Sequence, residues 1–214
     1  MKAGATTHTP NGRSYKSPLR VRQSEQTRAS ILEALTAELA EGGLHELNIP
    51  AIARRAGVAV RTVYRYFPTR DALLDAVDRW MDDTIVPGPP PASADEMPAM
   101  AERAFKEFDA NETAMRAQWA SALGRDVRAR GRRRRISAYG SALAAATSNL
   151  SRSDARAAHA VISHLLSSLT WKTMREEFGM KGSESGKAVS WALRTLIDDV
   201  KHRNESSRKE APNT

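Results

Sequence analysis

Residues 48–81 constrain the fold more than any other part of the chain. They contain two short apolar-periodic segments separated by a glycine, and a third segment that starts directly after a proline. The apolar residues of the first segment recur with the i, i+3, i+4 and i+7 spacing of one helix face. They are Ile49, Ile52, Ala53 and Ala56. Asn48 is suited to cap this helix, and Gly57 can turn the chain through positive φ without steric cost. The pattern predicts a helix that ends near Gly57 and a second helix that starts at once.

The second segment, residues 60–67, predicts a short helix with one buried face. Val63 and Phe67 are four residues apart and form that face. The other sides carry Arg61, Thr62, Tyr64, Arg65 and Tyr66. Two helices joined by a tight glycine turn are typical of the helix-turn-helix motif, which places its second helix in the major groove of DNA. The alternative interpretation is an ordinary helical hairpin with a solvated basic face.

Residues 24–81 resemble the DNA-binding domain of the TetR family of transcriptional repressors. The strongest similarity is in A-G-V-A-V-R-T-V-Y-R-Y-F-P-T-R-D-A-L-L, residues 56–74. In that family a Tyr-x-Tyr/His-Phe sequence closes the recognition helix, and a short Pro/Ser/Lys turn starts the fourth helix. At those places this chain has Tyr64, Tyr66, Phe67, Pro68, Thr69 and Arg70. Beyond Met81 the resemblance is one of architecture only.

The chain departs from the family pattern where the recognition helix begins. Family members often have a serine cap at the position of Ala59, and alanine forgoes that cap at a cost of about 1 kcal/mol. Val60 and Arg61 also differ from the polar and small pair common there. We expect these two positions to give an unusual operator preference.

The resemblance implies a set of DNA contacts. We expect Arg61 and Tyr66 to reach base edges. We expect phosphates to be held by Asn48, Thr62, Tyr64 and Arg70, because base contacts specify a sequence and phosphate contacts position the protein. The full predicted set is Asn48, Val60, Arg61, Thr62, Tyr64, Tyr66, Thr69 and Arg70.

Composition divides the chain into five parts, and no segment shows the alternation of a strand. Residues 1–22 carry five Lys or Arg and no acid, and we expect a disordered basic tail. Its Lys16, Arg20 and Arg22 either reach DNA or belong to a solvated leader. Residues 23–83 form the helix-turn-helix domain, with a first helix from about Ser24 to the Gly42-Gly43 pair. Residues 84–98, with five prolines, form a linker; residues 99–203 form a helical ligand-binding and dimerisation domain; residues 204–214 form a disordered tail. The predicted fold class is all-α.

The sequence of the C-terminal domain predicts five helices, at about 95–109, 112–123, 126–149, 151–178 and 185–202. Gly124 separates the second from the third, which turns Ile136, Tyr139, Leu143 and Ala146 inward. Gly179, Gly182 and Gly186 loosen the connection to the last helix. The last two helices have small, apolar faces that are either core or a subunit interface. The family resemblance implies a homodimer that uses them to read a palindromic operator. The interface candidates are Leu165, Leu169, Val189, Leu193 and Leu196.

Aromatic and polar side chains of this domain suggest a small-molecule site. The candidates are Phe105, Phe108, Met115, Trp119, Tyr139, Leu143, His164, Ser168 and Trp171. These faces carry few charges, so we expect an apolar or aromatic effector with His164 and Ser168 as polar anchors. Each aromatic has a second interpretation as plain core.

The arginine run RARGRRRR, residues 128–135, is the strongest local charge in a chain of net charge +8. Such a run can bind nucleic acid phosphates. At the start of an amphipathic helix a solvated face is favoured, although the run can also lie against acids of a neighbouring helix.

The sequence lacks the motifs of common enzymes and cofactor sites. It has no cysteine, no glycine-rich phosphate loop, no paired metal-binding histidines and no recognisable nucleophile. It also has no apolar run long enough for a membrane span and no hydrophobic signal core. We expect a cytoplasmic protein with no enzymatic activity, no metal and no cofactor.

These observations predict a DNA-binding transcriptional regulator. It is expected to be a repressor that a small apolar or aromatic effector releases from its operator. One alternative is a ligand-independent DNA-binding protein with an architectural or activator role. The other is an enzyme with an attached DNA-binding domain, which the lack of a catalytic constellation disfavours.

Overall fold

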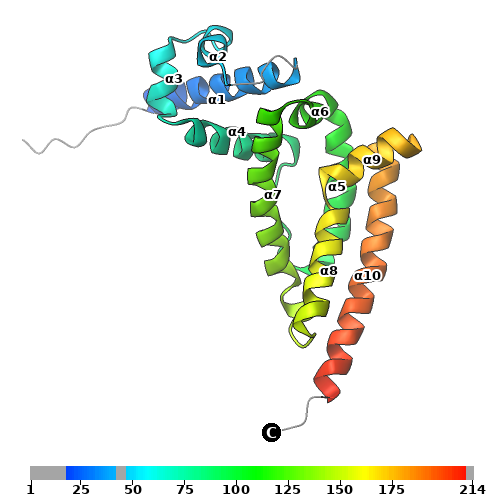
Figure 1. Ribbon diagram of the computed structural model, residues 1–214. Helices are drawn as coiled ribbons and strands as arrows, with labels where there is room; N and C mark the ends of the chain where they lie inside the picture. The colour runs from blue at the N-terminus through cyan, green and yellow to red at the C-terminus, as the bar shows by residue number, and fades with distance from the viewer. Residues whose placement is uncertain (1–17, 42–46, 211–214) are drawn as a thin grey trace, which may run out of the picture.

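The computed structural model describes residues 18–41 and 47–210, and all regular structure within them is helical (Figure 1). The predicted all-α class is therefore confirmed. The N-terminal helices are α1 (Pro18–Ala40), α2 (Ile49–Arg55), α3 (Val60–Tyr66) and α4 (Arg70–Ile85). A short 3-10 helix, η1 (Ala94–Glu96), leads to α5 (Met97–Ala110), α6 (Glu112–Ala120) and α7 (Ala122–Leu143). After η2 (Ala145–Thr147) come α8 (Arg152–Leu165), α9 (Ser168–Phe178) and α10 (Gly182–Glu210).

The first four helices form a compact group at one end of the molecule, and α5, α7, α8 and α10 run lengthwise away from it (Figure 1). The stripe predicted for α1 is buried, with Ile31, Leu35 and Leu39 at most 1% exposed. It packs with Val63 of α3 and Leu74 of α4 in one hydrophobic core. Burial of this stripe fixes α1 behind the two short helices.

Helix α1 begins earlier than the sequence indicated. It starts at Pro18, where proline is tolerated because the first helical amides have no partner in the helix. Arg20 and Arg22, which we assigned to a disordered tail, are helical and exposed, so that boundary was wrong. Residues 1–17 with Lys16, and residues 42–46 with the Gly42-Gly43 pair, lie outside the described part of the chain.

The proline-rich stretch does not separate two independent bodies. Helix α4 continues to Ile85 before the chain turns, and Pro91, Ala94 and Met97 are buried. The buried side chains of both halves form a single cluster, in which α1 contacts α6 and α4 contacts α7. The two halves thus share one core in this structure, and their separate movement stays a prediction.

Three glycines of the C-terminal half allow close helix packing where the sequence suggested breaks. The break between α6 and α7 falls at Ser121, whose side chain caps α7 by accepting from the Gly124 amide. Gly124 itself lies inside α7, where a Cβ would come within 2.4 Å of the Ala117 carbonyl oxygen. Gly182 begins α10, and Gly186 lies within it. A Cβ at Gly182 would lie 2.1 Å from the Phe105 carbonyl oxygen, so α10 packs tightly on α5.

Two further expectations for this half were wrong. The helix predicted over 151–178 is split at Leu166 and Ser167, and the Ser167 side chain accepts from the Thr170 amide to cap α9. Ile136, predicted to point inward, is 40% exposed. Tyr139, Leu143 and Ala146 are buried as predicted.

Candidate DNA-binding surface and effector cavities

Helices α2 and α3 form a rigid helix-turn-helix, held by local hydrogen bonds. The Asn48 side chain caps α2 by accepting from the Ala51 amide at 3.0 Å. Gly57 has the positive φ of 67° that the turn requires. Ala59 makes no side-chain cap, as predicted, whereas Thr69 caps α4 by accepting from the Ala72 amide at 3.1 Å. Side-chain caps thus fix the starts of α2 and α4, and Gly57 fixes the turn, whereas α3 has no side-chain cap.

The recognition helix α3 presents one exposed face. Its inward residues Val63 and Phe67 are buried, which directs Arg61 and Tyr64 into solvent. Val60 is also exposed and Thr62 is half-buried. An exposed guanidinium and an exposed aromatic ring on a seven-residue helix suit contact with a major groove.

Tyr66 does not point outward as the sequence suggested. It is half-buried, and its hydroxyl donates to the Ser24 hydroxyl of α1 at 3.0 Å. When Tyr66 is ionised, the Ser24 hydroxyl can donate to its oxygen, and this interaction lowers the pKa of Tyr66. The aromatic ring exposed on α3 is instead that of Tyr64, for which the sequence had suggested a phosphate contact.

Arg70 and Arg55 are engaged by carboxylates in the DNA-free protein. Arg70, a predicted phosphate contact at the start of α4, lies 2.9 Å from Asp126 of α7, and both side chains are about half exposed. Arg55 pairs with Glu38 and Glu41 of α1. A phosphate at Arg70 must compete with Asp126, so this residue connects the DNA-binding surface to α7.

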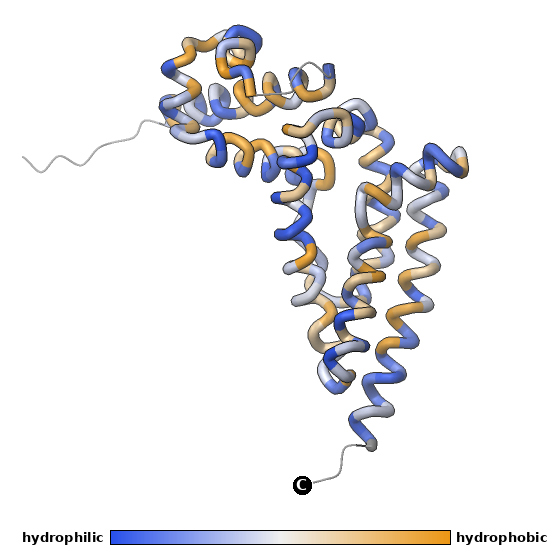
Figure 2. The backbone as a smooth tube through the Cα atoms, in the orientation of Figure 1, coloured by the Kyte–Doolittle hydropathy of each residue, from blue (hydrophilic) through white to orange (hydrophobic). Residues whose placement is uncertain are grey.

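A row of ion pairs joins α4 to α7. The aspartates recur at i, i+4, i+7 and i+11 along α4, and α7 supplies three arginines opposite them, on its hydrophilic stretch in Figure 2. Arg130 pairs with Asp71 and Asp75 at 2.6 and 2.5 Å. Arg134 pairs with Asp78 at 2.6 Å and also with Asp82, and Arg135 pairs with Asp82 at 2.7 Å. We call these seven residues the arginine–aspartate ladder. The favoured interpretation of the run as a solvated face was therefore wrong for these three arginines, and the pairing with a neighbouring helix holds.

Asp78 is the buried member of the ladder, with 4% of its surface exposed. Gly131 of α7 lies against it, and a Cβ there would be 2.2 Å from Asp78 Oδ1. Burial raises the pKa of Asp78, and the negative charge of Asp82 raises it further, against the opposite effect of Arg134. The glycine thus lets α7 approach α4 closely enough to shield this carboxylate from water.

A cavity of about 380 Å³ lies beside the ladder. It is lined by α4, the proline-rich stretch, α5, α6, α7 and the start of α9, and we call it the α4 cavity. Four predicted ligand residues line it: Phe108, Met115, Tyr139 and Ser168. Burial raises the pKa of Tyr139 to about 12, so its hydroxyl is a neutral hydrogen-bond donor at physiological pH.

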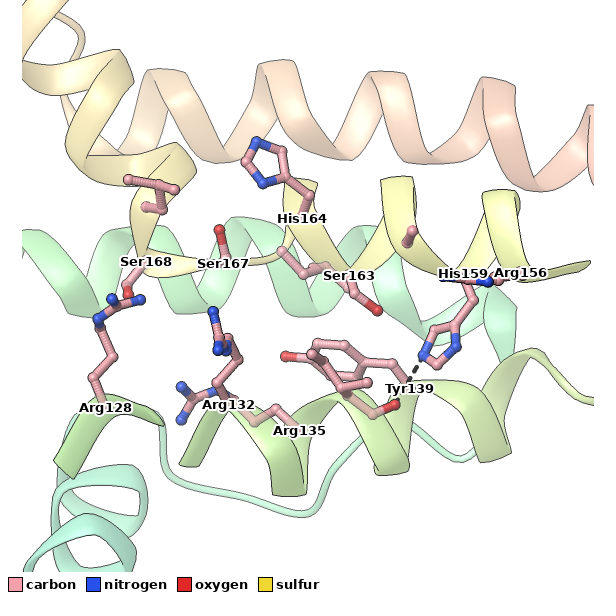
Figure 3. Close-up of a pocket in the computed structure, with 14 residues that line it drawn as sticks. Arg128, Arg132, Arg135, Tyr139, Arg156, His159, Ser163, His164, Ser167 and Ser168 are labelled. Atoms are coloured by element: carbon pink, nitrogen blue, oxygen red, sulfur yellow. Dashed lines mark hydrogen bonds between the residues drawn. The ribbon is translucent and has the colours of Figure 1, made fainter. Parts of the chain in front are cut away.

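A second cavity, of about 370 Å³, lies between α7 and the α8–α9 corner (Figure 3). We call it the α7–α8 cavity. The predicted residues Tyr139, His164 and Ser168 line it. The other candidates line neither cavity. Phe105, Leu143 and Trp171 are fully buried core, and Trp119 has Arg128 stacked on its ring at 3.7 Å.

The charged lining of both cavities was not predicted from the sequence. Arg79, Arg103 and Arg134 line the α4 cavity, Arg128 and Arg132 line the other, and Arg135 lines both. The expectation of few charges on these faces was therefore wrong. The signal was present in the arginine run, whose members point to different sides of one helix.

Within residues 18–41 and 47–210, no group of three or more His, Asp or Glu side chains is placed to hold a metal ion. In the same residues no helix combines the length and apolar character needed to cross a lipid bilayer.

Comparison with known proteins gives matches to the N-terminal part of the chain. The family model for bacterial regulatory proteins of the tetR family matches residues 31–77. The HTH-type transcriptional repressor KstR of Rhodococcus jostii is 44% identical over 50 residues, which are 23% of this chain and 24% of that protein. The HTH-type transcriptional regulator BetI of Yersinia pestis is 39% identical over 54 residues, 25% of this chain and 27% of that protein. The chain therefore aligns with only about a quarter of the length of these relatives.

The arrangement of α1 to α4 defines a helix-turn-helix DNA-binding domain. This domain belongs to the TetR family of bacterial transcriptional regulators, which confirms the resemblance drawn from residues 24–81.

Proposed function

We propose that the protein is a transcriptional regulator that binds a palindromic operator as a homodimer and is released from it by a small effector. The observation that carries this proposal is the capped helix-turn-helix, with Arg61 and Tyr64 exposed on α3 and with a sequence that matches the TetR family. The related KstR is named a repressor, which favours repression by occupancy of a promoter.

A dimer is supported by exposed apolar side chains on the last helices. Val161 of α8, Leu169 of α9 and Trp191 of α10 are 49%, 38% and 69% exposed. Large exposed apolar groups in neighbouring helices favour a protein–protein contact. Val189 and Leu193, predicted interface candidates, are buried in the monomer core and do not belong to this surface. Leu165 and Leu196 are half-buried beside it.

The effector proposal is supported by the position of the α4 cavity. Asp82, Arg134 and Arg135 belong to the ladder and also line this cavity. A ligand that contacts them changes how α7 holds α4, and α4 begins at the turn that ends α3. Releasing DNA a hundredfold requires about 2.7 kcal/mol of difference in effector affinity between the two states.

The rival function is a DNA-binding protein that responds to no ligand. The two are distinguished by whether any compound changes operator affinity, because an effector and the operator must weaken each other's binding by the same factor. Equal effector affinity in free and operator-bound protein contradicts the switch.

Selection of fragments from genomic DNA with the purified protein tests DNA binding directly. We expect a few fragments to be enriched and to share one inverted repeat. Arg61→Ala should weaken binding to that repeat by about 1–3 kcal/mol and flatten the base preference at one position of each half-site. Fluorescence anisotropy on single-base variants measures both effects. If Arg61→Ala keeps the parent's ratio between operator and random DNA, Arg61 does not read a base.

A further inference from the structure

The α7–α8 cavity has a strongly basic lining. Arg128, Arg132, Arg135 and Arg156 surround it together with His159 and His164, and among the described residues no carboxylate lines it. In Figure 3 the Arg128 and Arg132 side chains extend from α7 toward the start of α9. The arginines of the run therefore lie on two sides of α7. Arg130 and Arg134 face α4, and Arg128 and Arg132 face this cavity.

Two buried polar atoms at this cavity have no hydrogen-bond partner in the described structure. They are Nε of Arg128 and the hydroxyl oxygen of Ser163. Burial and the neighbouring Arg132 lower the pKa of Arg128, which is the effect of a cation held without a countercharge. Its guanidinium is fixed in place by stacking on Trp119. Unpaired buried donors are costly, and an anion bound beside Arg128 would satisfy its guanidinium.

The start of α9 adds to the same site. Ser167 caps this helix, and Ser167, Ser168 and Leu169 all line the cavity. The first amides of a helix have no partner within it and favour a negative charge. Apolar groups also line the cavity, namely Ile136, Leu166 and the ring of Tyr139. The lining thus combines cationic groups with apolar surface.

We propose that the α7–α8 cavity binds a small organic acid, with the carboxylate between Arg128, Arg132 and the start of α9, and the apolar body against Ile136, Leu166 and Tyr139. The volume of about 370 Å³ is in the range of small-molecule sites. This site is separate from the α4 cavity, although Arg135 lines both.

The shared arginine gives the acid a route to the DNA-binding domain. Arg135 pairs with Asp82 of the ladder at 2.7 Å and also lines the α7–α8 cavity, so a carboxylate bound there beside Arg132 adds a second negative charge that attracts that guanidinium. Occupancy of the cavity weakens one contact between α7 and α4. This regulatory consequence rests on the proposed function, whereas the binding of the acid does not.

Calorimetric titration of the full chain, without DNA, tests the site. The probes are octanoate, benzoate and 1-naphthoate, each compared with its neutral amide. We expect at least one acid to bind, and its amide to bind at least about tenfold more weakly because the charge-assisted contacts are lost. If none of the three acids binds, or if acid and amide bind equally, the proposal is wrong.

Four variants locate the acid. Arg128→Gln and Arg132→Gln should each weaken acid binding about tenfold or more. Arg133→Gln, at an exposed residue of the same helix, and Arg103→Gln, in the lining of the α4 cavity, should leave it unchanged. Circular dichroism and operator binding confirm that each variant is folded. Loss of binding in Arg103→Gln with no loss in Arg128→Gln would place the acid in the α4 cavity and overturn the assignment. Because these titrations contain no DNA, their failure leaves the proposed regulator function standing.

Discussion

Replacing Val161 and Trp191 by glutamate should turn a dimer into a monomer that no longer binds its operator tightly. Both side chains are exposed in the single subunit, so the change should leave its fold intact. In a dimer the same positions would bring two carboxylates into an apolar contact, where uncompensated charge is costly. A monomer engages one half-site at a time, and the loss of bivalent binding should lower operator affinity by about 100-fold or more.

Analytical ultracentrifugation and operator titration measure the two effects. Leu19→Glu is the matched control, because it places the same charge on an exposed apolar residue of α1, in the other half of the molecule. The control should sediment as the parent does. A parent that sediments as a monomer at micromolar concentration while binding the operator tightly would rule out the dimer.

Removing Arg134 should give the largest loss of stability from a single ladder residue. Asp78 is buried, and without Arg134 it becomes a buried carboxylate that has lost its ion-pair partner. Removal of one partner from a buried ion pair typically costs 3–5 kcal/mol. Arg134 is itself 43% exposed, so water can enter and we expect about 3 kcal/mol for Arg134→Ala, the lower end of that range.

The loss in Arg134→Ala should depend on pH in a definite direction. The folded-state pKa of Asp78 is raised, so the folded protein holds this proton more tightly than the unfolded chain does. Above this raised pKa the ionised Asp78 carboxylate destabilises the folded protein. Protonation of Asp78 restores that stability as the pH falls through the pKa. Without Arg134 the pKa rises further, so urea unfolding should show a smaller deficit at mildly acidic pH than at neutral pH. Arg133→Ala should show little deficit at either pH, and an equal deficit for Arg134→Ala at both would contradict the role of Asp78.

The DNA-binding half was well predicted because its signals are local. A cap at Asn48, a positive φ at Gly57 and the i, i+4 pair Val63 and Phe67 each depend on residues close in sequence. Tyr66 was the exception. Its direction is decided by Ser24, which is far away in sequence and which the local pattern does not reveal.

The C-terminal half was harder to predict from the sequence because its helix ends and its ion pairs are set by tertiary contacts. Gly124 and Gly182 looked like helix breakers, but both are places where backbones approach closely. The arginine run could not be assigned until α7 was placed against α4. The aspartate spacing in α4 was visible in the sequence, yet only the fold shows that it lies opposite the run. For the same reason Phe105 and Trp171 could not be distinguished as core from residues that line a cavity.

A hydroxyl-radical footprint of the protein on its selected DNA fragment shows directly whether two recognition helices bind DNA together. Two recognition helices related by a twofold axis must enter successive major grooves on one face of the duplex. We therefore expect two protected half-sites with inverted sequence, their centres about 34–36 Å apart. A single protected site, or uniform protection without sequence preference, would contradict a dimeric helix-turn-helix regulator.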